Sequence, residues 1–219
     1  MAEMIDLSHA IEDGMLTYTG LPAPKITDHL SRKASRGHYT EGTTFQIGKI
    51  EMVANTGTYI DAPFHRFAGG RDLSQFDLDS VANLDGLVLR AESISRAITP
   101  DLCHGRDVGG KAVLVHTGWD RHWSTPHYFE SHPFLTRQAA EYLKSAGAAL
   151  VGIDSLNIDD NTDGTRPAHT ILLEANIPIV EHMCNLNSLP DSGFKFFAVP
   201  APVRGMGSFP VRAFALIGD

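Results

Sequence analysis

The chain has few cysteines, no long apolar run and no excess of positive charge. Its 219 residues include two cysteines, Cys103 and Cys184, which are too few for a disulfide framework or a thiolate metal cage. No uninterrupted apolar run approaches the roughly 20 residues needed to span a bilayer. The formal net charge is -8, and no cluster of basic residues stands out. The sequence therefore argues against nucleic-acid and membrane partners.

Several signatures of targeting and of catalysis are also missing. The first residues, "MAEMIDLSHAIEDG", are acidic early and lack the apolar core of a signal peptide. There is no Gly-rich phosphate loop, nucleophile elbow or paired-cysteine motif. We therefore expect a cytoplasmic protein with two unpaired thiols, whose partner is a small-molecule substrate.

The pattern of apolar residues predicts a β-rich chain. A hydrophobic fraction of 42% and a charged fraction of 20% are typical of a globular protein, and residues 1–219 are expected to form one domain. Seven short apolar runs, each bounded by Gly, Pro or Asp, read as strands: 45–54, 86–91, 111–117, 148–154, 177–183, 194–203 and 211–217.

Two segments carry helical signals. Apolar residues at helical spacing follow Thr136, a suitable N-cap, and stop at Gly147. A shorter helix over 167–176 would have Pro167 in its first turn. Helix followed by strand occurs twice in a β-rich background, which predicts an α/β fold with a mixed sheet or partly closed barrel and a few flanking helices. Residues 1–40, rich in Gly, Pro and Thr from Asp13 onward, read as an extended arm that lies over a site or a partner subunit.

The stretch "VANTGTYIDAPFH" (53–65) concentrates polar groups where a strand ends. If it continues the strand of residues 45–54, alternation places Asn55, Tyr59 and Asp61 on one face. Pro63 then turns the chain and brings His65 back toward Asp61. The plainer alternative is that Asp61 caps the turn and His65 bonds locally.

A second cluster follows in "HTILLEANIPIVEHM". A helix from His169 to about Asn176 rises roughly 10 Å, and the next strand returns about 15 Å to Glu181. His169 and Glu181 should therefore lie at the same level, where an imidazole and a carboxylate suit a divalent metal. Alternatively, His169 satisfies backbone groups at the helix start and Glu181 pairs with an arginine.

Two further segments are weaker candidates. "GIDSLNIDD" ends a predicted strand with Asp154, Ser155, Asp159 and Asp160, which read as a turn cluster or as support for a site. Trp119 follows another strand and would either wall a small apolar pocket or pack in the core.

These segments, in this order, resemble the cyclase family of metal-dependent hydrolases, which includes bacterial kynurenine formamidases and isatin hydrolases. The resemblance runs from "IDLSHAIEDGMLTYTG" through "NTGTYIDAPFH", "VLVHTGWD", "LVGIDSLNID" and "HTILLEANIPIVEHMCNL" to "GSFPVRAFAL". It implies a β-rich swivelling α/β fold, a homodimer or homotetramer, and hydrolysis of small amides or cyclic amides.

The family signature is His-x-Gly-Thr-His-x-Asp-x-Pro-x-His, and this chain departs from it twice. Gly57, Thr58, Asp61, Pro63 and His65 keep their places, whereas Asn55 and Tyr59 replace the two leading histidines. In the relatives those histidines and the Asp bind one metal ion. The Asp serves a second metal position with a downstream His and Glu, which match His169 and Glu181, and the closing His is an acid/base group.

Asn55 and Tyr59 are poor substitutes for imidazole ligands, because a carboxamide binds weakly and a phenol must first lose a proton with a pKa near 10. We therefore expect one divalent ion, zinc or manganese, on Asp61, His169 and Glu181.

In this first hypothesis the catalytic residues are His65, Tyr59 and Asp61, and Asn55, Thr58 and Trp119 bind substrate. The substrate would be a small amide, cyclic amide or lactone. A metal-independent acid–base enzyme that uses Tyr59, Asp61 and His65 is the alternative, and a non-catalytic binding protein is the second alternative.

Overall fold

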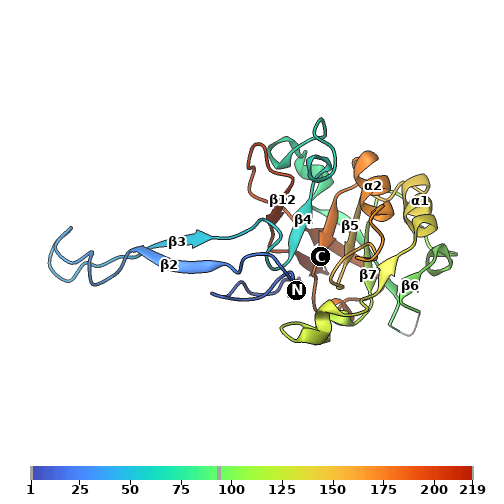
Figure 1. Ribbon diagram of the computed structural model, residues 1–219. Coiled ribbons are helices and arrows are strands. Elements are labelled where there is room, and N and C mark those ends of the chain that lie inside the picture. Colours follow the sequence, from blue (N-terminus) through green and yellow to red (C-terminus); the bar gives the residue numbers. More distant parts are fainter. Residues whose placement is uncertain (1, 93–94, 219) are drawn as a thin grey trace.

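The computed structural model describes residues 2–92 and 95–218. Nine strands form one mixed sheet in the order β1-β13-β11-β5-β7-β9-β10-β4-β12. The four central strands β5, β7, β9 and β10 run parallel, and the strands on both flanks are antiparallel to their neighbours. The sheet curves into a half-barrel (Figure 1). The predicted fold class, a β-rich mixed sheet with few helices, is confirmed.

The strands of this sheet fall into three groups. The parallel centre consists of β5 (Leu84–Arg90), β7 (Ala112–His116), β9 (Leu150–Ile153) and β10 (Ile179–Glu181). One flank consists of β11 (Ser192–Phe197), β13 (Phe214–Ile217) and β1 (Glu3–Asp6). The other flank consists of β4 (Tyr59–Asp61) and β12 (Ser208–Pro210). Two separate pairs are β2 (Lys25–Leu30) with β3 (Ile47–Glu51), and β6 (Ala97–Ile98) with β8 (Phe134–Leu135).

Two α-helices, the only ones in the described ranges, lie on one face of the sheet. Helix α1 (Arg137–Ser145) begins after Thr136, whose hydroxyl accepts from the Ala139 amide, as predicted. Helix α2 (Pro167–Glu174) has its proline in the first turn. The two helices lie side by side (Figure 1). None of the described helices has the length and apolar character that crossing a membrane requires.

Alternation along the central strands produces a core on each face of the sheet. Leu87 and Leu89 of β5 pack toward the helices, in the cluster that contains Leu143. Val88, between them, faces the opposite cluster, which contains Phe196. Because both faces are buried, the parallel strands are mostly apolar, which is why the sequence identified them readily.

Two expectations for the N-terminal third were wrong in detail. The chain does not run as one strand from the 45–54 segment to Asp61: β3 ends at Glu51 and β4 begins at Tyr59. Gly57 has a φ of 66°, and the Thr56 hydroxyl closes a turn by donating to the Val53 carbonyl. The expected arm over 1–40 also begins later, because β1 is an edge strand of the sheet paired with β13.

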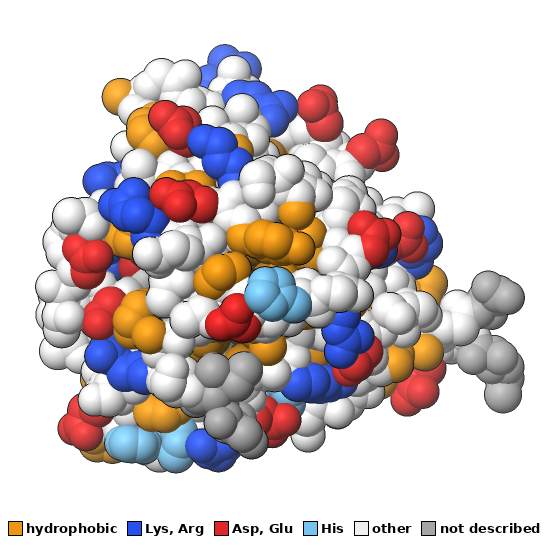
Figure 2. All heavy atoms as spheres, turned by 90° about the vertical axis from the view of Figure 1, so that its right-hand side faces the viewer, with side chains coloured by type: hydrophobic (Ala, Val, Ile, Leu, Met, Phe, Trp, Pro, Cys, Tyr) orange, Lys and Arg blue, Asp and Glu red, His pale blue; other side chains and the backbone are white. Residues whose placement is uncertain are grey.

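The β2–β3 pair forms a ribbon that projects from the body of the protein, drawn in blue in Figure 1. Its exposed apolar side chains include Ile26, Ile47 and Ile50. On the face of the molecule in Figure 2, acidic and basic side chains are interspersed around apolar areas.

Candidate active site

The short strand β4 carries the centre of the site. Because side chains alternate along a strand, Tyr59 and Asp61 project to the same face. The register with β10 places Glu181 opposite Tyr59, and the register with β12 places Ser208 opposite Asp61. Two neighbouring strands therefore supply a partner for each of the two polar residues of β4.

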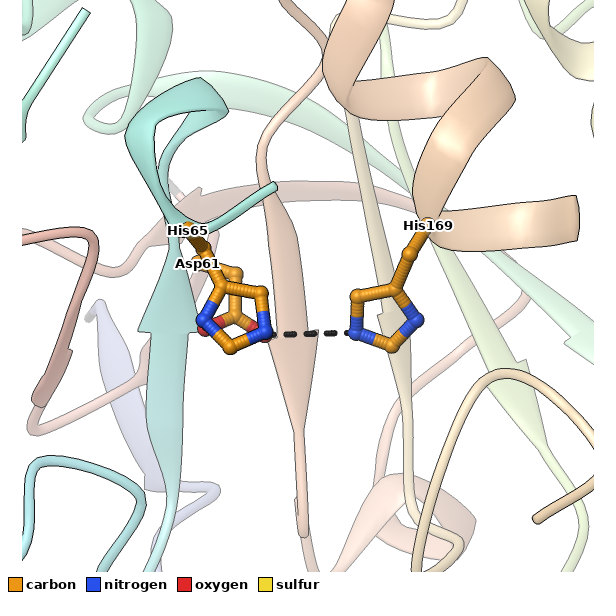
Figure 3. A group of neighbouring side chains, drawn as sticks. All are labelled: Asp61, His65 and His169. Atoms are coloured by element: carbon orange, nitrogen blue, oxygen red, sulfur yellow. Dashed lines mark ion pairs between the residues drawn. The ribbon is translucent and has the colours of Figure 1, made fainter. Parts of the chain in front are cut away.

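The Asp61 carboxylate is fully buried and its two oxygens have different environments. Its Oδ1 accepts from the Ser208 hydroxyl and lies 3.5 Å from His65 Nδ1. Its Oδ2 lies 3.5 Å from His169 Nε2 and has no hydrogen-bond partner among the described residues. Burial opposes charge on this carboxylate, but His169 and His65 hold its pKa below the ordinary value. Figure 3 shows the two imidazoles facing each other, with a dashed line between Asp61 and His169.

A tight turn positions His65, as the sequence predicted. The turn Pro63–His65 follows β4 directly, and the Ala62 amide donates to the Gly207 carbonyl at 2.7 Å. A Cβ on Gly207 would lie only 2.3 Å from the His65 amide nitrogen. The segment before β12 can therefore approach the turn only with glycine at this position.

Asp159 fixes both the start of α2 and the orientation of His169. Its carboxylate accepts from the backbone amides of Ala168 (2.6 Å) and His169 (3.0 Å), and from His169 Nδ1 at 2.7 Å. With Nδ1 donating to Asp159, Nε2 of His169 faces Asp61 and Glu181. One of the acidic residues considered as support in "GIDSLNIDD" therefore holds the imidazole in place.

The environment of His169 requires positive charge. Burial lowers its affinity for a proton, but Glu181, Asp159 and Asp61 outweigh burial and raise the pKa of His169 to about 9. The carboxylates of Glu181, Asp159 and Asp61 converge on this one imidazole, and its second proton offsets part of their negative charge. A metal cation at the same place would do the same. A divalent ion would displace that proton and satisfy Asp61 Oδ2.

Glu181 and Tyr59 form a buried pair. The Tyr59 hydroxyl donates to Glu181 Oε2 at 2.5 Å, and Asn157 Nδ2 donates to the same oxygen at 3.3 Å. The other oxygen, Oε1, accepts from the Ile158 amide at 2.6 Å and lies 3.7 Å from His169 Nε2. Burial and the Glu181 carboxylate raise the pKa of Tyr59 well above its ordinary value. Tyr59 is therefore a neutral donor and not a phenolate ligand.

Four of the side chains described above line a cavity of about 170 Å³: Tyr59, His65, His169 and Glu181. Its walls come from the N-terminal segment, from β4 and the residues that flank it, and from the region around α2. The lining residues are Tyr18, Leu21, Asn55, Tyr59, His65, Asn157, Arg166, His169 and Glu181. The segment expected to lie over a site does so through Tyr18 and Leu21.

Of the eight residues expected to act in catalysis, metal binding or substrate binding, five line this cavity, Asp61 contacts two of those five, and Thr58 and Trp119 lie elsewhere. The Thr58 hydroxyl donates to the His182 carbonyl at 2.5 Å and accepts from the His9 amide, so it stabilises the backbone. Trp119 donates from Nε1 to the Tyr128 carbonyl at 3.0 Å and does not line the cavity. Neither side chain stands where the expected substrate-binding role would place it.

Ser208, Tyr18, Asn157 and Arg166 were not identified from the sequence. Two of them stand next to informative residues in the sequence: Ser208 follows Gly207, and Arg166 stands three residues before His169. Tyr18 and Asn157 had no local signal, since only the folded chain brings the Asn157 amide within 2.7 Å of the Tyr18 hydroxyl.

The described residues contain one compact group of three metal-ligand side chains, Asp61, His65 and His169, whose ligand atoms lie within 4.8 Å of one another. The sequence had predicted Glu181 as the third ligand with Asp61 and His169. Glu181 is close to His169 Nε2, but both of its oxygens already accept hydrogen bonds. His65 belongs to the compact group by proximity, although its Nδ1 lies within hydrogen-bond distance, 2.8 Å, of the Ser208 hydroxyl.

Comparison with known proteins gives consistent matches along the chain. The family model described as "Putative cyclase" matches residues 5–160. The kynurenine formamidase of Geobacillus thermodenitrificans is 28% identical over 215 residues, which cover 97% of each chain. That of Bacillus cytotoxicus is 26% identical over 212 residues, covering 97% of this chain and 96% of its own.

Solved structures match over the full length. A potential metal-dependent hydrolase with cyclase activity has a TM-score of 0.82 at 25% identity, with 100% of both chains covered. An isatin hydrolase bound to the product analogue thioisatinate also has a TM-score of 0.82, at 22% identity, covering 100% of this chain and 93% of its own. At that identity the second match concerns the fold alone.

Proposed function

The chain belongs to the cyclase family, and on this basis we propose that it hydrolyses a small amide, cyclic amide or lactone with a single divalent metal ion, zinc or manganese. The kynurenine formamidase relatives support an amide substrate. The observation that carries the metal is the buried Asp61 Oδ2, which lacks a hydrogen-bond partner among the described residues and faces His169 Nε2.

The donor set fits one ion better than two. Asp61 Oδ2 and, once a cation displaces its proton, His169 Nε2 can bind that cation, and Glu181 Oε1 and His65 lie beside them. At the other family position, Asn55 is a weak ligand and Tyr59 stays protonated. A bound divalent ion would activate water and polarise the substrate carbonyl.

His65 is positioned as the proton acceptor. Ser208 has one hydroxyl proton, which it donates to Asp61 Oδ1, so its oxygen must accept from His65 Nδ1 at 2.8 Å. This chain of bonds fixes the tautomer of His65 and leaves the lone pair on Nε2. His65 can thus take a proton from water and return it to the leaving amine.

Metal analysis tests this proposal directly. Protein purified without chelator should carry about one ion per chain, and EDTA should abolish turnover on a panel of small amides, imides and lactones. Asp61→Asn should lose the ion. His65→Asn should retain it and lose roughly 100-fold or more in kcat, the usual size of a general-base contribution.

Other outcomes identify the alternatives. A metal-free protein that keeps its activity in EDTA would contradict the metal-dependent mechanism. It would favour acid–base chemistry by Tyr59, Asp61 and His65. Absence of turnover on the whole panel, with no effect of His65→Asn on ligand binding, would favour a binding protein.

A further inference from the structure

One cationic side chain of the cavity has no part in the mechanism above. Arg166 is the only lysine or arginine among the lining residues, all of which belong to the described part of the chain. Its side chain is 29% exposed, so it reaches the cavity without being fully solvated. The pocket also contains Glu181, and a carboxylate ligand would be repelled there unless a positive charge received it.

The backbone at Arg166 is strained. The residue has φ 49° and ψ 59°, a left-handed conformation that is unfavourable for an L-residue other than glycine. It also precedes Pro167, which further restricts its conformations. Strain of this kind persists where the surrounding structure enforces it and is concentrated at functional sites.

The guanidinium retains unused donors. Nη1 donates to Asn161 Oδ1 at 3.1 Å, and Nε lies 3.7 Å from Asp159 Oδ2. Nη2 is 3.4 Å from His169 Nδ1, but that nitrogen carries the proton donated to Asp159 and cannot accept. Of the five N–H groups of arginine, those on Nη2 therefore have no acceptor among the described residues.

We propose that Arg166 binds a carboxylate on the substrate and so selects small amides that carry an acid group close to the scissile bond. A guanidinium fork suits a planar carboxylate. Nη2 of Arg166 lies only 3.4 Å from His169 Nδ1, so the acid and the reacting carbonyl must be only a few bonds apart. This proposal rests on the hydrolase function proposed above.

A matched pair of substrates tests it. N-formylanthranilate and formanilide differ only by the ortho carboxylate. The wild-type enzyme should prefer the first, and Arg166→Gln should lower kcat/KM for it about 10- to 100-fold, mainly through KM, the range expected for a charge-assisted hydrogen bond. Formanilide hydrolysis should change less than about twofold. Equal losses on both substrates, or no preference in the wild type, would overturn the proposal.

Two variants control for structure. Arg66 donates to Thr170 on α2 but does not line the cavity, so Arg66→Gln removes a nearby charge and should leave the preference intact. Arg166→Lys keeps the charge near Asp159 but loses the fork. It should fold, and should still lose about tenfold on N-formylanthranilate.

Direct binding separates this proposal from the hydrolase function. Calorimetry with benzoate should show binding to the wild type and to Arg66→Gln, and at least tenfold weaker binding to Arg166→Gln. If no amide is turned over, the hydrolase function fails while this difference still supports Arg166 as a carboxylate site. Equal binding by the wild type and Arg166→Gln, or no binding by the wild type, would refute it.

Discussion

Replacing Asp159 by asparagine tests how the site holds His169. The carboxylate accepts from His169 Nδ1 at 2.7 Å and from two backbone amides at the start of α2. An asparagine has a single acceptor oxygen, and its NH2 group would face a donor. We therefore expect Asp159→Asn to weaken the orientation of His169 and to leave at least one buried amide unpaired.

The magnitude follows from these contacts. Loss of a carboxylate that orients a ligand histidine typically costs 10- to 100-fold in metal affinity, or about 1.4–2.7 kcal/mol. The unpaired amide should lower the free energy of unfolding by a further 1–3 kcal/mol or so. Zinc affinity of the purified enzyme is measured by chelator competition, and stability by urea denaturation.

The neighbouring Asp160 supplies the control. Its carboxylate accepts from Arg96 and Thr162, away from the cavity, so Asp160→Asn should leave zinc affinity unchanged. If Asp159→Asn bound zinc within twofold of the wild type, the claim that Asp159 orients His169 would be refuted.

Three substitutions test other parts of the structure. Gly207→Ala should displace the turn that bears His65 and so lower kcat. It should also lower the free energy of unfolding, measured by urea titration, by about 1–3 kcal/mol. A variant as active and as stable as the wild type would contradict the close contact between Gly207 and His65. Thr58→Val should cost about 1–3 kcal/mol without changing the metal content, whereas a changed KM with unchanged stability would restore a role in substrate binding. Burial against Trp123 lowers the pKa of His9 from 6.5 to about 4. Its neutral form is therefore favoured on folding, and stability is lost as pH falls from 6.5 toward 4. His9→Phe should remove up to about 2 kcal/mol of the wild-type stability difference between pH 7.5 and 5, and an unchanged difference would exclude His9 as its source.

The parts of the site that the sequence predicted are those fixed by short connections. Three residues, one of them Pro63, separate Asp61 from His65, and one helix and one short strand connect His169 to Glu181, so chain geometry alone places each pair. The parallel strands could also be predicted from the sequence, because both of their faces are buried and their residues are mostly apolar.

The remaining parts depend on long-range register or on a single dihedral angle. Ser208 reaches Asp61 only because β12 pairs with β4, and no local pattern encodes that pairing. The continuous strand assumed for 53–61 is interrupted because Gly57 adopts a positive φ, and Thr58 lies on the face opposite Tyr59, where its hydroxyl bonds the His182 carbonyl and the His9 amide. Tyr18 meets Asn157 because of the path that the N-terminal segment takes over the site. That segment is rich in Gly and Pro, so residue propensities do not predict its path.

The projecting ribbon has a consequence for local unfolding. β2 and β3 pair with each other and with no other described strand, and a two-stranded hairpin alone is marginally stable in water. The amides of paired residues such as Thr27 and Lys49 should therefore exchange with solvent far faster than those of the buried strand β7. If the expected homodimer or homotetramer covers the ribbon, its exchange will slow as protein concentration rises, so these amides would report assembly independently of catalysis.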